Sequence, residues 1–120
     1  MVEELKPLVD LRNTLIVIKN EWNSKNPEHR IQIRRALFQA LVDHGLKPSQ
    51  ENIENLEKPP EMEGISISIS HCPLAGGFAV DYGGKGIGLD LEVSDRIQKP
   101  VVARVSSLKE LELAPRPSAL

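Results

Sequence analysis

Strict alternation of apolar and polar residues in the middle of the chain is the feature that most limits its fold. Residues 65–70 read Ile-Ser-Ile-Ser-Ile-Ser. Large apolar residues also stand at every second position over residues 78–82 and 87–93. Because successive side chains of a strand point to opposite faces, each run predicts a strand with one apolar face. The glycine-rich residues 83–86 lie between the second and third runs, and they predict that these two strands form a hairpin.

Helical spacing dominates the chain before these strands. Apolar residues recur in steps of three and four over residues 8–22 and again over residues 26–45, so the sequence predicts two helices. Asn26 and Pro27 are typical of the start of the second helix, and Gly45 is typical of its end.

The remaining segments complete the expected order of elements. Residues 46–64 are polar and proline-rich, and they predict a connection with a short helical turn at 49–56. Residues 100–107 begin at a proline and predict a further short helix. We therefore expect residues 1–120 to form a single α+β unit, with helices packed on one face of a small antiparallel sheet.

Composition narrows the classes of function. Fifteen basic and seventeen acidic residues give a formal net charge of −2, which excludes a nucleic-acid binder that relies on overall positive charge. The one cysteine excludes a disulfide framework and a cysteine-rich zinc site. No apolar run approaches the roughly 20 residues that a membrane span needs, and the acidic start does not resemble a signal peptide. We expect a cytoplasmic protein with neither a nucleic-acid nor a membrane partner.

The sharpest local feature is the sequence Gly-Leu-Asp-Leu-Glu at residues 88–92. On a strand, Asp90 and Glu92 project from the same face, whereas Leu89 and Leu91 project from the opposite face toward the core. Two neighbouring carboxylates repel each other, and Mg²⁺, which takes one or two carboxylates together with phosphate oxygens and water, would neutralise them. A solvated strand face explains the same spacing, so both interpretations stay open.

A second set of residues suits an anion. Ser70 and His71 end the Ile/Ser strand, and a histidine near pH 7 can donate a hydrogen bond to a phosphate oxygen. Arg30 and Arg34 are four residues apart on one helical face, and Lys58 precedes two prolines. Taken singly, each of these residues is more typical of a strand end or a charged helix surface than of an anion site.

Taken together and in this order, these features resemble the amino-terminal half of the 4′-phosphopantetheinyl transferases, in particular the double-length, surfactin-synthetase-activating type. The resemblance covers roughly residues 28–113, and its Ser-His and Gly-x-Asp-x-Glu pieces are the most specific. The matching landmarks are His29-Arg30, Lys58-Pro59, Ile69-Ser70-His71-Cys72, Gly88-Leu89-Asp90-Leu91-Glu92, and the group Arg104, Ser107 and Glu110.

The resemblance implies a magnesium-dependent holo-[carrier protein] synthase. Such an enzyme moves the 4′-phosphopantetheine arm of coenzyme A to a serine of an acyl or peptidyl carrier protein in fatty-acid, polyketide or peptide synthesis. It implies that Asp90 and Glu92 bind magnesium, and that Asp90 and Glu110 serve catalysis, Glu110 by assisting deprotonation of the attacking serine. The residues implied to contact coenzyme A are Arg30, Lys58, Ser70 and His71. The fold implied is one of two similar α+β halves related by a pseudo-twofold axis, with coenzyme A between them.

The chain departs from the family pattern after residue 113. The family's second signature places a tryptophan before a lysine-glutamate pair, whereas the only tryptophan here is Trp22. We therefore expect that the carboxy-terminal half is absent from this chain, and that the unit needs a second half-domain or associates with itself. Two other hypotheses stay open: a non-catalytic module that binds coenzyme A or a carrier protein, and an unrelated α+β interaction domain.

Overall fold

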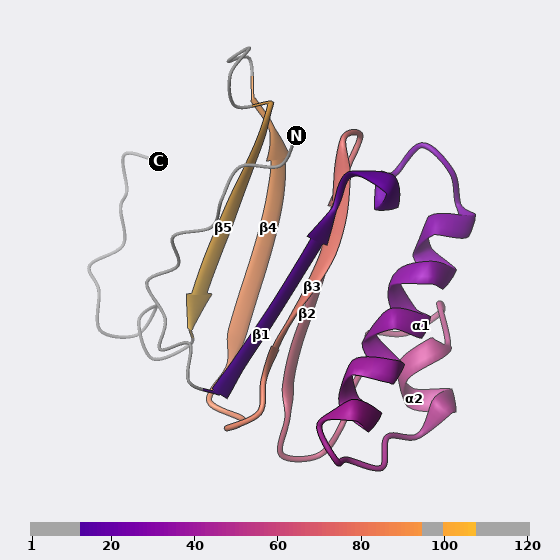
Figure 1. Cartoon of the computed structure of the whole chain (residues 1–120), viewed down its shortest axis with the longest axis vertical. Helices are drawn as coiled ribbons and strands as arrows, with labels where there is room; N and C mark the ends of the chain where they lie inside the picture. The colour runs from indigo at the N-terminus through magenta and orange to yellow at the C-terminus, as the bar shows by residue number, and fades with distance from the viewer. Residues whose placement is uncertain (1–12, 95–99, 108–120) are drawn as a thin grey trace.

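The computed structural model describes residues 13–94 and 100–107. The elements in chain order are β1 (Thr14–Lys19), the 3-10 helix η2 (Asn20–Trp22), α1 (Glu28–Asp43), α2 (Gln50–Glu54), β2 (Ser66–Cys72), β3 (Ala75–Asp81), β4 (Ile87–Val93) and β5 (Val101–Ser107). Strands β1, β3 and β2 form one antiparallel sheet in that order, and β4 and β5 form a separate antiparallel pair. Helices α1 and α2 cover one face of the three-stranded sheet, and the β4–β5 pair lies on its other side (Figure 1). The predicted α+β class is therefore confirmed.

Two apolar clusters lie on opposite sides of the three-stranded sheet. The register pairs Val17 of β1 and Ile69 of β2 with Phe78 of the central strand, and all three side chains pack against the helices. The residues between these positions in the sheet face the β4–β5 pair, because successive side chains along a strand point to opposite faces. The buried members of that second cluster are Cys72, Ala75, Ala79, Leu89, Leu91, Val101 and Val105. Strand β3 contributes to both clusters and is buried along almost its whole length.

The predicted helix over residues 8–22 is wrong where the structure describes it. Residues 14–19 form β1 and residues 20–22 form η2, whereas residues 8–12 lie outside the described part of the chain. Most of the side chains in β1 are β-branched, and such side chains fit a strand better than a helix. Both faces of β1 are apolar because it borders both clusters, so its sequence does not show the alternation of a strand with one wet face.

The predicted second helix is confirmed as α1, and the short turn expected at 49–56 contains α2. The side-chain oxygen of Asn26 accepts a hydrogen bond from the Glu28 N–H at 2.9 Å, just ahead of the first turn. After the last turn, Gly45 adopts φ +89°, and the Leu46 N–H donates to the Leu41 carbonyl at 3.1 Å. This left-handed glycine and back-donated hydrogen bond are a common way to end a helix.

Two predictions about the later strands are wrong. The glycine-rich turn does not join a hairpin, because β3 pairs on its two edges with β1 and β2, and β4 pairs instead with β5. The turn is held by the Asp81 carboxylate, which accepts hydrogen bonds from the Gly83 and Lys85 N–H groups at 2.8 and 2.9 Å. Residues 101–107, expected to be helical, form β5, in which Val101 and Val105 are buried beside β4.

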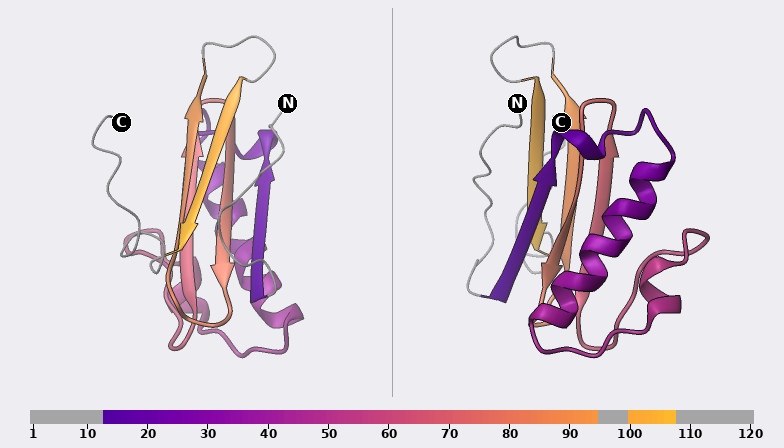
Figure 2. Two further views of the ribbon diagram at one scale, coloured as in Figure 1. Left: turned by 90° about the vertical axis from the view of Figure 1, so that its left-hand side faces the viewer. Right: turned by 45° about the vertical axis from the view of Figure 1, so that its right-hand side comes forward.

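Serine hydroxyls join β2 to β4. The oxygens of Ser66, Ser68 and Ser70 accept hydrogen bonds from the N–H groups of Gly86, Leu89 and Leu91 at 2.8, 2.9 and 3.0 Å. Because these partners advance together along both strands, β2 and β4 run in the same direction. Both views of Figure 2 show the β4–β5 pair stacked on the side of the sheet away from α1. We call the row of three contacts from Ser66, Ser68 and Ser70 the serine seam.

In the part of the chain that the structure describes, no helix is long and apolar enough to cross a membrane.

Candidate functional site

A cavity of about 370 Å³ opens between α1 and β2. Arg30 reaches it from the first turn of α1 and Arg34 from the second, and His71 reaches it from the end of β2. The cavity is lined by Arg30, Ile33, Arg34, Pro59, Pro60, Ile67, Ser68, Ile69 and His71. It therefore combines an apolar floor from the sheet with two guanidinium groups and an imidazole.

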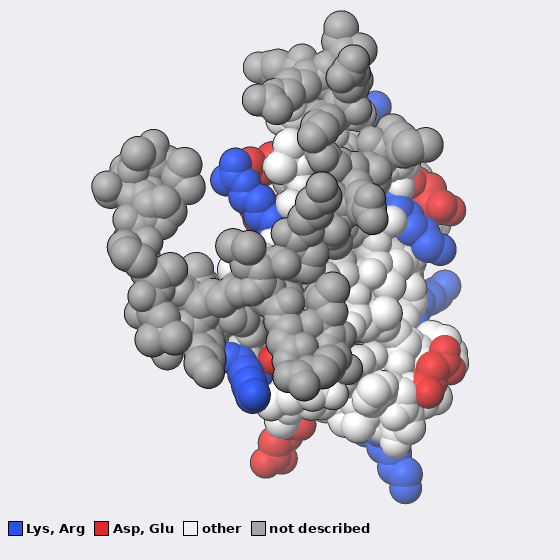
Figure 3. Space-filling view, turned by 60° about the vertical axis from the view of Figure 1, so that its left-hand side comes forward, with Lys and Arg blue, Asp and Glu red and all other residues white. Residues whose placement is uncertain are grey.

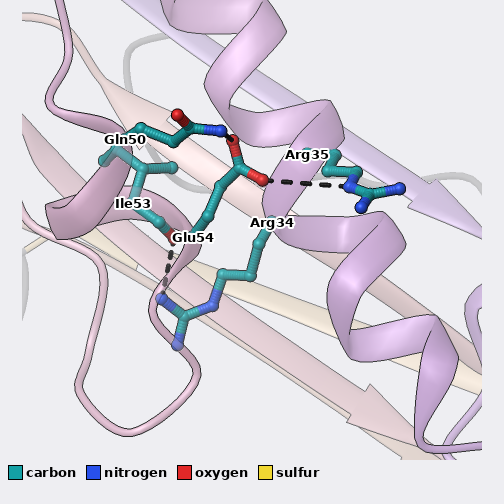
Figure 4. Close-up of polar contacts among 5 residues, drawn as sticks. All are labelled: Arg34, Arg35, Gln50, Ile53 and Glu54. Carbon is teal, nitrogen blue, oxygen red and sulfur yellow. Dashed lines mark hydrogen bonds and ion pairs between the residues drawn. The ribbon is translucent and has the colours of Figure 1, made fainter.

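Arg34 is the only buried charged residue in the described part of the chain, with 9% of its surface exposed. Its two terminal nitrogens donate to the carbonyl oxygens of Ile53 at 3.0 Å and Lys58 at 2.9 Å. Figure 4 shows the guanidinium reaching across from α1 to the end of α2. Burial, and then the neighbouring charge of Arg30, lower the pKa of Arg34. An anion in the cavity would relieve this repulsion between like charges.

Arg30 is exposed and donates to the Leu56 carbonyl at 3.2 Å. Within the described residues, neither Arg30 nor Arg34 forms an ion pair with a carboxylate. Two cations that share a cavity without a protein anion create a local positive potential, although the whole chain carries a formal charge of −2. The cavity is therefore suited to an anionic group such as a phosphate.

The structure brings together only part of the predicted set of anion contacts. Arg30 and His71 line the cavity, and Ser68, which the sequence analysis did not single out, lines it too. The hydroxyl oxygens of both Ser68 and Ser70 belong to the serine seam, where they accept from Leu89 and Leu91, and Ser70 does not line the cavity among the described residues. The Lys58 ammonium donates to the Asn52 side-chain oxygen at 2.8 Å, and Lys58 is not among the described residues that line the cavity.

The two predicted metal ligands share one face of β4. Asp90 and Glu92 are exposed, whereas the alternate residues Leu89 and Leu91 are 7% and 4% exposed in the second apolar cluster. Arg104 of β5 lies directly across from Asp90, and its Nη2 is 3.7 Å from Glu92 Oε2. On the surface left visible in Figure 3, which looks from the β4–β5 side, acidic and basic side chains are interspersed rather than gathered in one patch.

The donor set of Asp90 and Glu92 fits Mg²⁺ in chemical type, because this ion binds to one or two carboxylates and completes its shell with phosphate oxygens and water. Among the described residues, no group of three or more histidine, cysteine or acidic side chains could form a fuller cage. Glu110, the third carboxylate that the sequence singles out, lies outside the described residues.

Asp90 and Glu92 lie on β4, which neighbours the strand β2 that lines the cationic cavity, but their carboxylates are not part of that cavity. Of the described residues, neither Asp90 nor Glu92 lines the cavity between α1 and β2. The hydrogen bond between Ser70 and Leu91 nevertheless places the acidic segment beside the strand end that carries His71. The carboxylates thus belong to the β4–β5 side of the sheet, whereas the cavity opens on its α1 side (Figure 2).

A second cavity, of about 400 Å³, lies at the other end of α1. The rings of His44 and Tyr82 form a wall of it, stacked at 3.6 Å between centroids and only 6° from parallel. Burial, and then the charge of Asp43, raise the pKa of Tyr82. No spacing in the sequence links His44 to Tyr82, because the contact forms only when the end of α1 packs beside the end of β3.

A scan against protein-family models finds no match, and neither do searches of curated proteins and of solved structures. The chemistry of the site therefore rests on its own residues: a cationic cavity on one side of β2 and a pair of carboxylates on the adjoining strand.

Proposed function

We propose that this chain is a unit of a magnesium-dependent 4′-phosphopantetheinyl transferase. The observation that carries the proposal is the cavity in which Arg30, Arg34 and His71 meet without a carboxylate partner among the described residues. Coenzyme A has a 3′-phosphate and a pyrophosphate, and guanidinium groups bind such oxygens well. The order of the Ser-His and Gly-x-Asp-x-Glu motifs along the chain supports the same assignment.

In the proposed reaction, the hydroxyl oxygen of a carrier-protein serine attacks the phosphorus that bears the pantetheine arm. The bond from this phosphorus to the bridging oxygen of the pyrophosphate breaks, and 3′,5′-ADP leaves. Arg30 and His71 hold phosphate oxygens, and Glu110 receives the proton of the serine hydroxyl. Asp90 and Glu92 would hold Mg²⁺, which when bound neutralises the negative charge of the pyrophosphate oxygens.

Two measurements test this function. Calorimetric titration with coenzyme A should show binding that Mg²⁺ strengthens and that Arg30→Met weakens about tenfold, the effect of losing one charge-assisted contact. Mass spectrometry of an apo carrier protein should then show the gain of one phosphopantetheine, with the chain alone or mixed with a carboxy-terminal half of a family member. Absence of coenzyme A binding under all these conditions would contradict the proposal.

The alternative is a module that binds coenzyme A or a carrier protein without turnover. The ion pair between Arg104 and Glu92 favours it, because one of the two carboxylates already has a protein cation nearby. Binding of coenzyme A that is indifferent to Mg²⁺, together with no transfer in any mixture, would support this alternative over the enzyme.

A further inference from the structure

We propose that Arg34 is a positioning residue, whose buried guanidinium fixes residues 53–60 against α1 and thereby sets the wall of the cationic cavity and the direction of Arg30. This inference rests on the proposed coenzyme A site for its functional consequence. Its structural part concerns only contacts within the chain.

The first support is that Arg34 donates hydrogen bonds to two backbone carbonyls of the same segment. Its guanidinium donates to Ile53, at the end of α2, and to Lys58, five residues later in the connection. A planar guanidinium can satisfy two carbonyl groups at once in a fixed geometry, whereas the point-like ammonium of lysine cannot hold both in the same way. Arg34 therefore determines where the whole span between these carbonyls lies.

The second support is what this span contributes to the cavity. Arg30 donates to Leu56, which lies between the two carbonyls that Arg34 holds, so the direction of the Arg30 side chain depends on that span. Pro59 and Pro60 follow immediately and form part of the cavity lining. A shift of the segment would move both the Arg30 anchor and the proline wall.

The third support is the contrast with the adjacent Arg35, which also contacts α2 (Figure 4). Arg35 Nε lies 3.8 Å from Glu54 Oε1, and the Arg35 side chain is 73% exposed. Exposed ion pairs of this kind contribute little to stability. Both arginines thus contact α2, but only Arg34 donates to backbone carbonyls of the segment, through one buried and one partly buried hydrogen bond.

The experiment compares Arg34→Lys and Arg34→Met with the matched control Arg35→Met, each first shown to be folded by near-ultraviolet circular dichroism. Calorimetric titration with coenzyme A should give affinities about tenfold weaker for both Arg34 variants and unchanged for the control. If Arg34 acted only through its charge, the lysine variant would keep the affinity, and that result would overturn the positioning role.

Hydrogen exchange gives a readout that does not depend on coenzyme A. The Lys58 N–H donates to the Asn55 carbonyl within the segment, and the Glu61 N–H donates to the Asn52 carbonyl across the two ends of the segment. Both N–H groups should exchange faster in Arg34→Lys than in Arg35→Met. Unchanged exchange in the lysine variant would overturn the inference even if coenzyme A binds. Faster exchange in a chain that does not bind coenzyme A would support the positioning role and count against the proposed function alone.

Discussion

Gly76 of β3 allows η2 to lie close against the sheet. A Cβ built at this position would collide with the carbonyl oxygen of Trp22 and would come within 3.0 Å of Ile33 Cδ1. The Trp22 carbonyl oxygen belongs to the backbone, so it cannot move aside as the end of a flexible side chain can. The small size of residue 76 is therefore a condition for burying the tryptophan, which is only 5% exposed.

We predict that Gly76→Ala lowers the free energy of unfolding by about 1–3 kcal/mol, the usual effect of forcing extra volume into a packed core. Chemical denaturation followed by tryptophan fluorescence measures it. The control is Gly88→Ala in β4, where the nearest atom to a built Cβ is Ser106 Oγ at 3.5 Å, an ordinary contact. Equal stability of the two variants would contradict the close approach at residue 76.

The magnesium proposal depends most on the carboxylate of Asp90. We predict that Asp90→Asn removes the strengthening of coenzyme A binding by Mg²⁺, because an amide keeps the shape but loses the charge that attracts the cation. Titrations with and without Mg²⁺ measure the effect, and transfer activity in any reconstituted enzyme should fall with it. Glu57→Gln, an exposed acidic position in the connection, serves as the control. An undiminished magnesium effect in Asp90→Asn would remove the assignment.

At the scale of elements, the serine seam is how the β4–β5 pair attaches to β2. The strands are held by side-chain acceptors rather than by a ladder between backbones. Ser68 and Ser70 each satisfy one N–H of β4, and Ser66 satisfies the N–H of Gly86 just before the strand. A strand edge whose N–H groups are satisfied in this way is protected from pairing with another chain. The alternation of isoleucine and serine in β2 thus has a role on both faces: the isoleucines pack on α1 and the serines hold β4.

We predict that Ser68→Ala speeds hydrogen exchange at the Leu89 N–H, because the substitution removes the acceptor and leaves a partly buried donor without a partner. A loss of about 1 kcal/mol, the typical net value of one hydrogen bond, corresponds to exchange several times faster. Ser24→Ala, at an exposed position before α1, should leave this amide unchanged. Equal Leu89 exchange in the wild-type protein and Ser68→Ala would show that the seam contributes nothing to the attachment.

At the scale of the molecule, β3 couples two apolar clusters that would otherwise be separate. Phe78 and Val80 point into the cluster under the helices, and Ala75 and Ala79 point into the cluster under β4 and β5. Because β3 is part of both clusters, unfolding that removes β3 from one cluster also disrupts the other. The described layers should therefore unfold in one cooperative step.

We predict that Leu37→Ala lowers the free energy of unfolding by about 2–5 kcal/mol, because this fully buried side chain leaves a cavity under the helices. Fluorescence of Trp22 and far-ultraviolet circular dichroism should report the same midpoint. Val42→Ala on the same helix is the control, since Val42 is 40% exposed. Separate midpoints for the two probes would contradict the coupling through β3.

Local pattern was enough to predict much of this protein. The polar and apolar alternation in β2 and β4 placed both strands and correctly put Asp90 and Glu92 on one exposed face, because the geometry of a strand alone assigns its faces. The spacing in residues 26–45 placed α1, and with it Arg30 and Arg34 on a common side. These features depend on neighbours a few residues away, which the sequence displays directly.

Long-range contacts were needed for the rest. Strands β1 and β5 bury apolar side chains against strands that are distant in the sequence, whereas their local patterns alone predict helices. The glycine-rich turn is locally typical of a hairpin, and no nearby residue indicates that both edges of β3 are paired with other strands. Likewise, the cavity joins Arg30 to His71 across a gap of 41 positions, and only packing of α1 on the sheet brings them together. Such pairings are set by the burial of surface shared between distant segments, and no short stretch of sequence contains that information.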